Sequence, residues 1–239
     1  MGIISRFPAG TTEPYIEETY DSYENLIDVK LHGYTKIRDY AFYSCYALAL
    51  TSLPAEITSI GLSAFYNCSS LALTSLPSGI TSIKEETFSH CYSLALTSLP
   101  SGITNIGDNA FEDCSSLTLT SLPNGITSIG YYAFHGCTNL ALTSLPSGIT
   151  KIDWATFQDC SSLALTSLPS GITHIEGQAF DGCTSLTSVT FEGTPESIAV
   201  SAFANCNNLT TINVPWAEGA VANAPWGAIN ATINYGHTR

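Results

Sequence analysis

Residues 91–113 read CYSLALTSLPSGITNIGDNAFED, and residues 114–136 read CSSLTLTSLPNGITSIGYYAFHG. The two stretches share the pattern C-x-x-L-x-L-T-S-L-P-x-G-I-T-x-I-G-x-x-A-F, which recurs with small changes along most of the chain. The eight cysteines of the sequence follow one another at intervals of 23 residues, at Cys45, Cys68, Cys91, Cys114, Cys137, Cys160, Cys183 and Cys206. A repeat of this length predicts a solenoid, in which each copy buries its apolar side chains against the next copy.

Three further columns keep the same register. A Phe stands three residues before each Cys, an Ile eight residues before it, and a Leu three residues after it. Positions are therefore numbered from the Cys of each repeat, so that the Phe column is position −3. We expect these columns to form the core, because stacking brings equivalent side chains together. A Pro at position +9 of six successive repeats indicates the end of a short strand, and we expect a Gly turn and a compact helical or 3₁₀ segment after it.

The even spacing of the cysteines argues against two familiar roles. A disulfide framework shows uneven spacings, and a zinc site shows close pairs such as C-x-x-C. We therefore predict a ladder of buried, reduced thiols, since Cys is small, apolar and suited to a repeated core position.

The motif I-x-x-x-A-F-x-x-C-x-x-L, recurring over residues 37–209, resembles the BspA-like, or Treponema-type, leucine-rich repeat family. The resemblance implies an α/β repeat solenoid: a right-handed curved array with a parallel β-sheet on its concave side and short helical or 3₁₀ segments opposite. It also implies a scaffold at the cell surface or outside the cell that binds host or matrix proteins.

The chain departs from this family at position +6. The family places Ile or Val there, as at Val189 and Ile212, but six central repeats carry Thr at +6 and move a Leu to +5. These leucines are Leu50, Leu73, Leu96, Leu119, Leu142 and Leu165. In a regular strand, positions +5 and +8 face opposite sides, so a buried +8 would leave an exposed apolar stripe at +5. Alternatively, the strand is irregular and both leucines are buried; the sequence leaves both readings open.

The two ends of the chain depart from the repeat. Residues 1–28 are expected to form an N-terminal cap rich in acids, with Glu13, Glu17, Glu18, Asp21 and Glu24. Residues 29–214 would form the solenoid of eight repeats, and residues 215–239 a C-terminal cap with two Trp and a final alternating strand. The closing motifs P-W-A-E-G and A-P-W-G-A resemble those of gut bacterial and prophage-like proteins.

Charge excludes several classes of partner. Charged residues make up 11% of the 239 residues, and 7 Lys and Arg against 20 Asp and Glu leave a net charge of −13. So few cations give little with which to displace counterions from nucleic acid, and anionic membranes repel the chain. We expect no nucleic-acid partner and no membrane insertion, because no apolar run of about 18 residues occurs either. Residues 1–8 also lack the regions of a secretory signal.

Candidate binding residues lie in the positions that vary between repeats, namely −7 to −5 and −2 to −1. Tyr131 and Trp154 share position −6 of adjacent repeats and should be neighbours, with Tyr132 and His135 close by. Tyr43 and Tyr66, with Tyr46, form a second aromatic group. Tyr and Trp offer rigid contact area at low entropic cost, as in protein interfaces and sugar-stacking sites. Solvent exposure alone would also permit this variation.

No catalytic pattern emerges from the sequence. The five His residues show no metal spacing, no G-x-S-x-G elbow or phosphate-cradling Gly loop occurs, and the acids Glu85, Glu86, Asp108, Glu112 and Asp113 suggest a solvated face. We predict no enzyme, cofactor or metal, and favour a non-catalytic scaffold for a protein or glycan ligand. A phage-like tail or receptor-recognition protein is the main alternative, and an accessory domain of an enzyme is the third.

Overall fold

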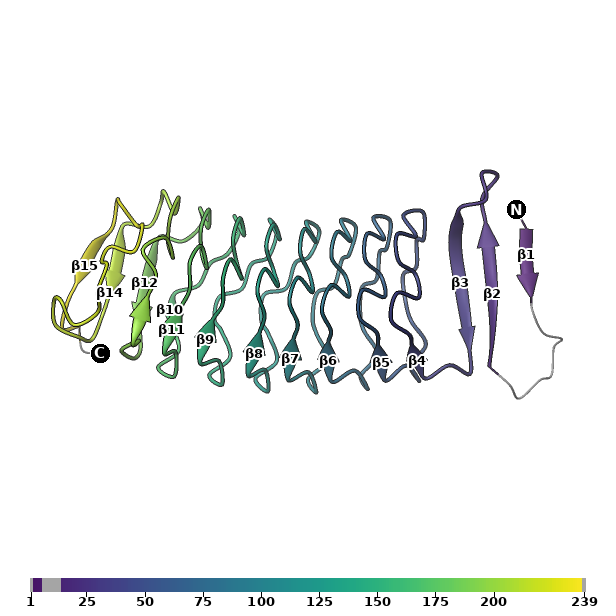
Figure 1. The fold of residues 1–239 in the computed structure, drawn as a ribbon, viewed down its shortest axis with the longest axis horizontal. Coiled ribbons are helices and arrows are strands. Elements are labelled where there is room, and N and C mark those ends of the chain that lie inside the picture. The colour runs from purple at the N-terminus through teal and green to yellow at the C-terminus, as the bar shows by residue number, and fades with distance from the viewer. Residues whose placement is uncertain (1, 6–13, 238–239) are drawn as a thin grey trace.

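Figure 1 shows the computed structural model of the protein, an elongated stack of similar coils with β1 to β3 at one end and β14 and β15 at the other. The structure describes residues 2–5 and 14–237. Its strands are β1 (Gly2–Ser5), β2 (Tyr15–Tyr20), β3 (Leu26–His32), β4 (Lys36–Ile37), β5 (Ser59–Ile60), β6 (Ser82–Ile83), β7 (Asn105–Ile106), β8 (Ser128–Ile129), β9 (Lys151–Ile152), β10 (Ser167–Leu168), β11 (His174–Ile175), β12 (Ser188–Phe191), β13 (Ser197–Ile198), β14 (Thr211–Asn213) and β15 (Thr232–Asn234).

The coils pair through very short parallel strands. In most coils a two-residue strand ends on the Ile of position −8, and each strand pairs with its equivalent one repeat away, as Ile83 does with Ile106. The Ile side chain is buried, whereas the residue before it is partly or fully exposed. The sheets have the orders β4-β5, β6-β7-β8, β13-β11-β9 and β10-β12-β14-β15. This register of one repeat confirms a parallel-stranded solenoid of stacked coils.

The core consists of the columns that the sequence predicts. The eight Phe rings of position −3 form one continuous stack from Phe42 to Phe203, with neighbouring centroids 5.0–5.7 Å apart and ring planes within 4–16° of each other. The Leu column of position +3 and the Ile column are buried beside this stack. Each internal Phe therefore packs between two other rings, and offset stacking of aromatic rings adds to the stabilisation from burial.

The leucines at position +5 do not form an exposed stripe. Leu73, Leu96 and Leu119 are fully buried, and Leu76 and Leu99 at position +8 are buried as well. Because positions +5 and +8 would face opposite sides of a regular strand, the backbone here is irregular, and the second reading of the sequence is right. The regular strands β12 and β14 form where Val189 and Ile212 replace the Thr of position +6 by an apolar β-branched residue.

The prediction of helical or 3₁₀ segments is wrong, because the described residues contain no helix. Between positions −7 and −1, some backbone N–H groups donate to carbonyls of the next coil and others donate to carbonyls of their own coil. Phe88 N–H donates to the Ala110 carbonyl of the next coil, whereas Cys91 N–H donates to the Phe88 carbonyl of its own coil. Left-handed residues, such as Glu86 (φ 52°) and His90 (φ 58°), also interrupt any helical run. Accordingly, no helix of the described residues is long and apolar enough to span a membrane.

The two ends close the stack differently. At the N-terminus β1, β2 and β3 form an antiparallel sheet, in which β3 runs across the predicted domain boundary at residue 28. At the C-terminus β15 pairs with β14. The backbone N–H of Phe203 donates to the carbonyl of the buried Trp226, which takes the place of the carbonyl that a further repeat would supply. Trp216, Trp226 and Phe191 pack together with ring centroids 5.2–6.2 Å apart. The domain boundaries at 28 and 214 stay predictions, and Glu13 of the predicted cap lies outside the described residues.

Candidate functional site

The cysteine ladder is structural. All eight cysteines are free, and seven of them donate the thiol S–H to the carbonyl of the Phe 26 residues earlier, at 3.0–3.1 Å: Cys68, Cys91, Cys114, Cys137, Cys160, Cys183 and Cys206. Burial raises the pKa of the Cys137 thiol well above its ordinary value, so the thiol stays protonated and remains a donor. A protonated, buried thiol is a poor nucleophile, so these seven cysteines link neighbouring coils and offer no reactive site. Cys45, at the end of the ladder, is partly exposed, so the prediction of a buried thiol is wrong there.

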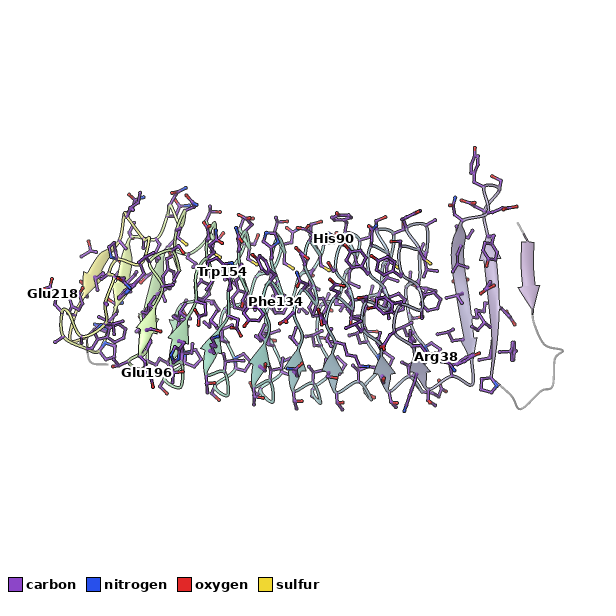
Figure 2. All side chains as sticks on the ribbon, in the orientation of Figure 1. Arg38, His90, Phe134, Trp154, Glu196 and Glu218 are labelled. Carbon is purple, nitrogen blue, oxygen red and sulfur yellow. The ribbon has the colours of Figure 1, made fainter. Side chains whose placement is uncertain are left out.

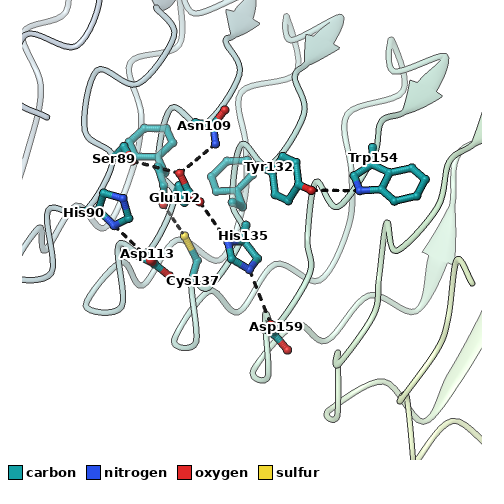
Figure 3. Close-up of polar contacts among 12 residues, drawn as sticks. Ser89, His90, Asn109, Glu112, Asp113, Tyr132, His135, Cys137, Trp154 and Asp159 are labelled. Atoms are coloured by element: carbon teal, nitrogen blue, oxygen red, sulfur yellow. Dashed lines mark hydrogen bonds and ion pairs between the residues drawn. The ribbon is translucent and has the colours of Figure 1, made fainter. Parts of the chain in front are cut away.

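Trp154 is held on both sides by neighbouring coils. Its indole Nε1–H donates to the hydroxyl of Tyr132 at 3.1 Å, and Figure 3 shows this bond reaching from one coil to the next. On the other side, a Cβ on Gly177 would come within 2.4 Å of the ring atom Cζ3. The ring nevertheless remains 43% exposed. Trp154 is therefore a fixed aromatic surface that faces solvent, and the glycine of the next coil makes room for it.

The ring of Tyr131 lies close to a charged group. The ring of Tyr131 is 47% exposed, and Lys151 Nζ lies 6.0 Å from its centroid. Lys151 also contacts Asp153 at 2.7 Å and Glu176 at 3.2 Å, and chiefly the bond to Asp153 raises the pKa of Lys151 to about 12. Lys151 is thus charged at every physiological pH. Its ammonium group lies beside the Tyr131 ring and beside the carboxylates of Asp153 and Glu176.

His135 belongs to a polar network that connects four successive coils, drawn in Figure 3. The Nδ1 atom of His135 lies 3.4 Å from Glu112 Oε1 and forms an ion pair with it, although the nitrogen is not aligned for a hydrogen bond. The Nε2 atom of the same ring lies 3.7 Å from Asp159 Oδ2. Glu112 also accepts hydrogen bonds from Ser89 at 3.3 Å and from Asn109 at 2.9 Å. The ring of Tyr132 packs edge-on against His135.

This network does not have the order that activates a nucleophile. In a Ser-His-Asp arrangement the imidazole lies between the hydroxyl and the carboxylate. Here the Glu112 carboxylate lies between Ser89 and His135, and the side chain of Ser89 is fully buried. Nor do the described residues contain a group of three or more His, Cys, Asp or Glu side chains that could hold a metal ion. The arrangement can bind a ligand by contact and hydrogen bonding.

The second aromatic group forms a row on the first three coils. Tyr43 stacks on Tyr66 with centroids 4.7 Å apart and planes within 7°, and Tyr66 meets the edge of His90 at 5.4 Å. His90 in turn contacts Asp113 at 3.1 Å. Tyr46, which the sequence groups with these residues, is 57% exposed. Tyr43 and Tyr66 therefore lie together as the sequence predicts, and the pair extends to His90.

Two of the variable positions carry a constraint that the sequence analysis missed. Positions −5 and −1 have positive φ in most repeats, as at Asn109 (φ 53°) and Asp113 (φ 56°). Asn, Asp and Gly tolerate this conformation best, which explains why they are frequent at position −1. The acids of the predicted solvated face are also partly engaged, since Glu86 accepts a hydrogen bond from Ser63 at 2.8 Å and Glu112 serves the network above. The recurrence of Asn, Asp or Gly at position −1 was the feature of the sequence that could have indicated the positive φ.

The pair His135 and Glu112 should make stability depend on pH. Contact with Glu112 chiefly raises the pKa of His135 above 6.5, and contact with His135 chiefly lowers the pKa of Glu112 below 4.5. The stability that the pair gains through His135 is complete below pH 6.5 and is lost as the pH rises through the raised pKa of His135. The stability that it gains through Glu112 is present above pH 4.5 and is lost in acid. We expect His135→Gln to cost up to about 1 kcal/mol between these values, since both side chains are still partly exposed to solvent, His135 by 25% and Glu112 by 21%.

Chemical unfolding of the wild type and of His135→Gln from pH 5 to 8 measures this difference, with His174→Gln as a control for an exposed His. The wild type should lose its advantage as pH rises above neutrality. An advantage that stays constant over this range would contradict the assignment.

Comparison with known proteins identifies related sequences and folds. A family model described as a BspA type leucine-rich repeat region matches residues 35–164 and 104–220 in six copies. A leucine-rich repeat protein from Bacteroides ovatus superposes with a TM-score of 0.58 at 19% identity over 98% of this chain and 75% of that one. The T. pallidum leucine-rich repeat protein gives 0.52 at 25% identity over 85% and 90%. No curated protein matches the chain.

Proposed function

Because the chain belongs to the BspA-type leucine-rich repeat family, we propose that it is a non-catalytic scaffold that binds a protein or glycan ligand at a bacterial surface or outside the cell. Proteins of this family are typically interaction scaffolds. The observation that carries the proposal is the fixed, half-exposed ring of Trp154, with Tyr131 and Tyr132 on the preceding coil.

Rigidity is the mechanism that we propose for binding. A ligand that orders a flexible side chain loses about 0.5–1.5 kcal/mol for each one. Trp154 is already held by Tyr132 and by the backbone at Gly177, and Lys151 is held by Asp153 and Glu176. The ligand would therefore meet an aromatic surface and polar groups whose positions the stacked core has already set.

The groups around Trp154 and Tyr131 suit both ligand classes. A sugar ring can stack on the exposed indole while its hydroxyls bond to carboxylates, and a protein can place an apolar side chain on the same rings. Tyr43 and Tyr66 provide a second aromatic surface near the N-terminal end of the same stack. In the proposed scaffold, a long ligand would contact both surfaces.

A binding screen over glycans and matrix proteins, followed by substitution, tests the proposal. The double variant Tyr131→Ala/Trp154→Ala should weaken binding of the ligand found by about tenfold or more, the effect expected for aromatic anchors. Thermal unfolding should change little, because both rings are about half exposed. Tyr23→Ala is the matched control, since Tyr23 is 84% exposed on the turn between β2 and β3.

Two results would count against this proposal. Equal losses of binding and of folding in the double variant would show that the two rings belong to the core. Unchanged binding in the double variant, together with loss in a Tyr43→Ala/Tyr66→Ala variant, would move the binding surface to the second aromatic group.

A further inference from the structure

The junction between β3 and the first coil is packed more loosely than the junctions between coils. Among the described residues, one backbone hydrogen bond crosses it, from Ala49 N–H to the Ile27 carbonyl. Two cavities of about 400 and 610 Å³ lie at this junction, and both are bordered by Leu31 of β3. The smaller one is lined by apolar side chains from β2, β3 and the first coil, with charged groups among them.

The apolar wall of the smaller cavity includes the end of the Phe stack. Phe134 in the middle of the stack has an aromatic ring on each face, whereas Phe42 stacks on Phe65 alone and lines the cavity. Ala41, beside Phe42, is exposed and also lines the cavity, although the equivalent Ala64 is fully buried. Phe42 itself is only 8% exposed, so its ring forms a small part of an apolar wall that Ile16, Leu31 and Ala41 complete.

The charged groups of this cavity favour an anion. Lys36 and Arg38 line it and are exposed, and neither side chain has a hydrogen-bond or ion-pair partner among the described residues. Figure 2 places Arg38 beside the lower end of β3. The one lining carboxylate, Asp39, accepts the Leu62 N–H at 2.7 Å and contacts Lys84 at 3.7 Å. Two unpartnered cations in one cavity are notable in a chain with only 7 Lys and Arg and a net charge of −13.

We propose that this cavity is a binding site for a small apolar anion, a molecule that carries a carboxylate or sulfonate on a compact apolar body such as an aromatic ring system. Its apolar body packs against Ile16, Leu31 and Ala41, and the anionic group reaches Lys36 and Arg38. A volume of about 400 Å³ lies within the range of small-molecule sites. This site is separate from the surface around Trp154 and does not depend on the proposed scaffold function.

Fluorescence titration with anilinonaphthalene sulfonate, an aromatic anion that brightens in apolar sites, tests the proposal. The wild type should bind one molecule. Lys36→Glu/Arg38→Glu should weaken binding by about tenfold, and binding of the uncharged probe phenylnaphthylamine should stay unchanged. Lys151→Glu is the matched control, because Lys151 is a cation outside the cavity.

A second variant fills the cavity. Leu31→Trp should abolish binding of both probes while circular dichroism shows an intact fold. Equal binding in wild type, Lys36→Glu/Arg38→Glu and Leu31→Trp would overturn the proposal. A wild type that is dimeric in solution and becomes monomeric on Leu31→Trp would also overturn it, since a second copy would then occupy the cavity.

Discussion

Phe134→Ala is expected to destabilise the protein by about 3–5 kcal/mol, the usual cost of removing a fully buried aromatic ring. Phe134 has no exposed surface, and its ring lies 5.4 Å from Phe111 and 5.6 Å from Phe157. The substitution leaves a cavity and also interrupts the stack. Because a solenoid is stabilised by contacts between neighbouring repeats, a break in the middle should uncouple the two halves. Urea unfolding followed by circular dichroism should show a lower midpoint and a broader transition.

Two variants control this experiment. Phe134→Leu keeps most of the apolar volume and loses the stacking, so it should cost clearly less than Phe134→Ala. Phe42→Ala removes a ring with one stacked neighbour and a cavity on its other side, and it should also cost less. If all three variants lost the same stability, the continuous stack would not be what couples the coils.

The core could be predicted because the same apolar positions recur in all eight repeats. A side chain at a fixed position must meet its own equivalent in the next coil, so the Phe, Cys, Ile and Leu columns predict their contacts without knowledge of the backbone path. The irregular segment at positions +5 to +8 could not be decided in this way. Leu73 and Leu76 are both buried, and alternation in a regular strand would have excluded one of them.

The prediction of helical segments was wrong for a reason that the sequence of a single repeat does not reveal. The A-F-x-x-C stretch has a local pattern that suits a helical turn, but half of its backbone bonds go to the next coil, as from Phe88 to Ala110. Positive φ at Glu86 and His90 then follows from the need to keep coils in register. Tertiary hydrogen bonding thus decides the conformation of this segment.

Some neighbours within the candidate site could be predicted from the sequence, but their individual contacts could not. Tyr132, His135 and Trp154 lie together, whereas the bond from Trp154 to Tyr132 and the place of Lys151 over the Tyr131 ring could not be predicted from the repeat. The signal for the position of Trp154 was the glycine one repeat later, Gly177, which replaces larger residues at the same position. Reading each variable position together with its neighbour in the next repeat would have found it.

The glycines of position −7 provide the second large expected effect. The sequence suggests that this position varies freely, because Arg38, Lys84 and Asp153 share it with Gly107. A Cβ on Gly107, however, would lie 2.6 Å from Glu85 N and 2.9 Å from Lys84 C, both backbone atoms of the preceding coil. Backbone cannot move aside as the end of a side chain can, so the two coils must separate. That shift would also strain the 2.8 Å bond from Gly107 N–H to the Ile83 carbonyl.

We therefore expect Gly107→Ala to destabilise the protein by about 1–3 kcal/mol, as overpacking does in a core. Gly102→Ala is the matched control in the neighbouring turn, since its Cβ would meet nothing closer than the Ile80 carbonyl oxygen at 3.9 Å. That variant should be neutral or gain about 0.4–1 kcal/mol, because alanine restricts the unfolded chain and this glycine has no positive φ. Urea unfolding of the two variants side by side measures the contrast. If Gly107→Ala matched Gly102→Ala, the close approach of the two coils at Gly107 would be refuted.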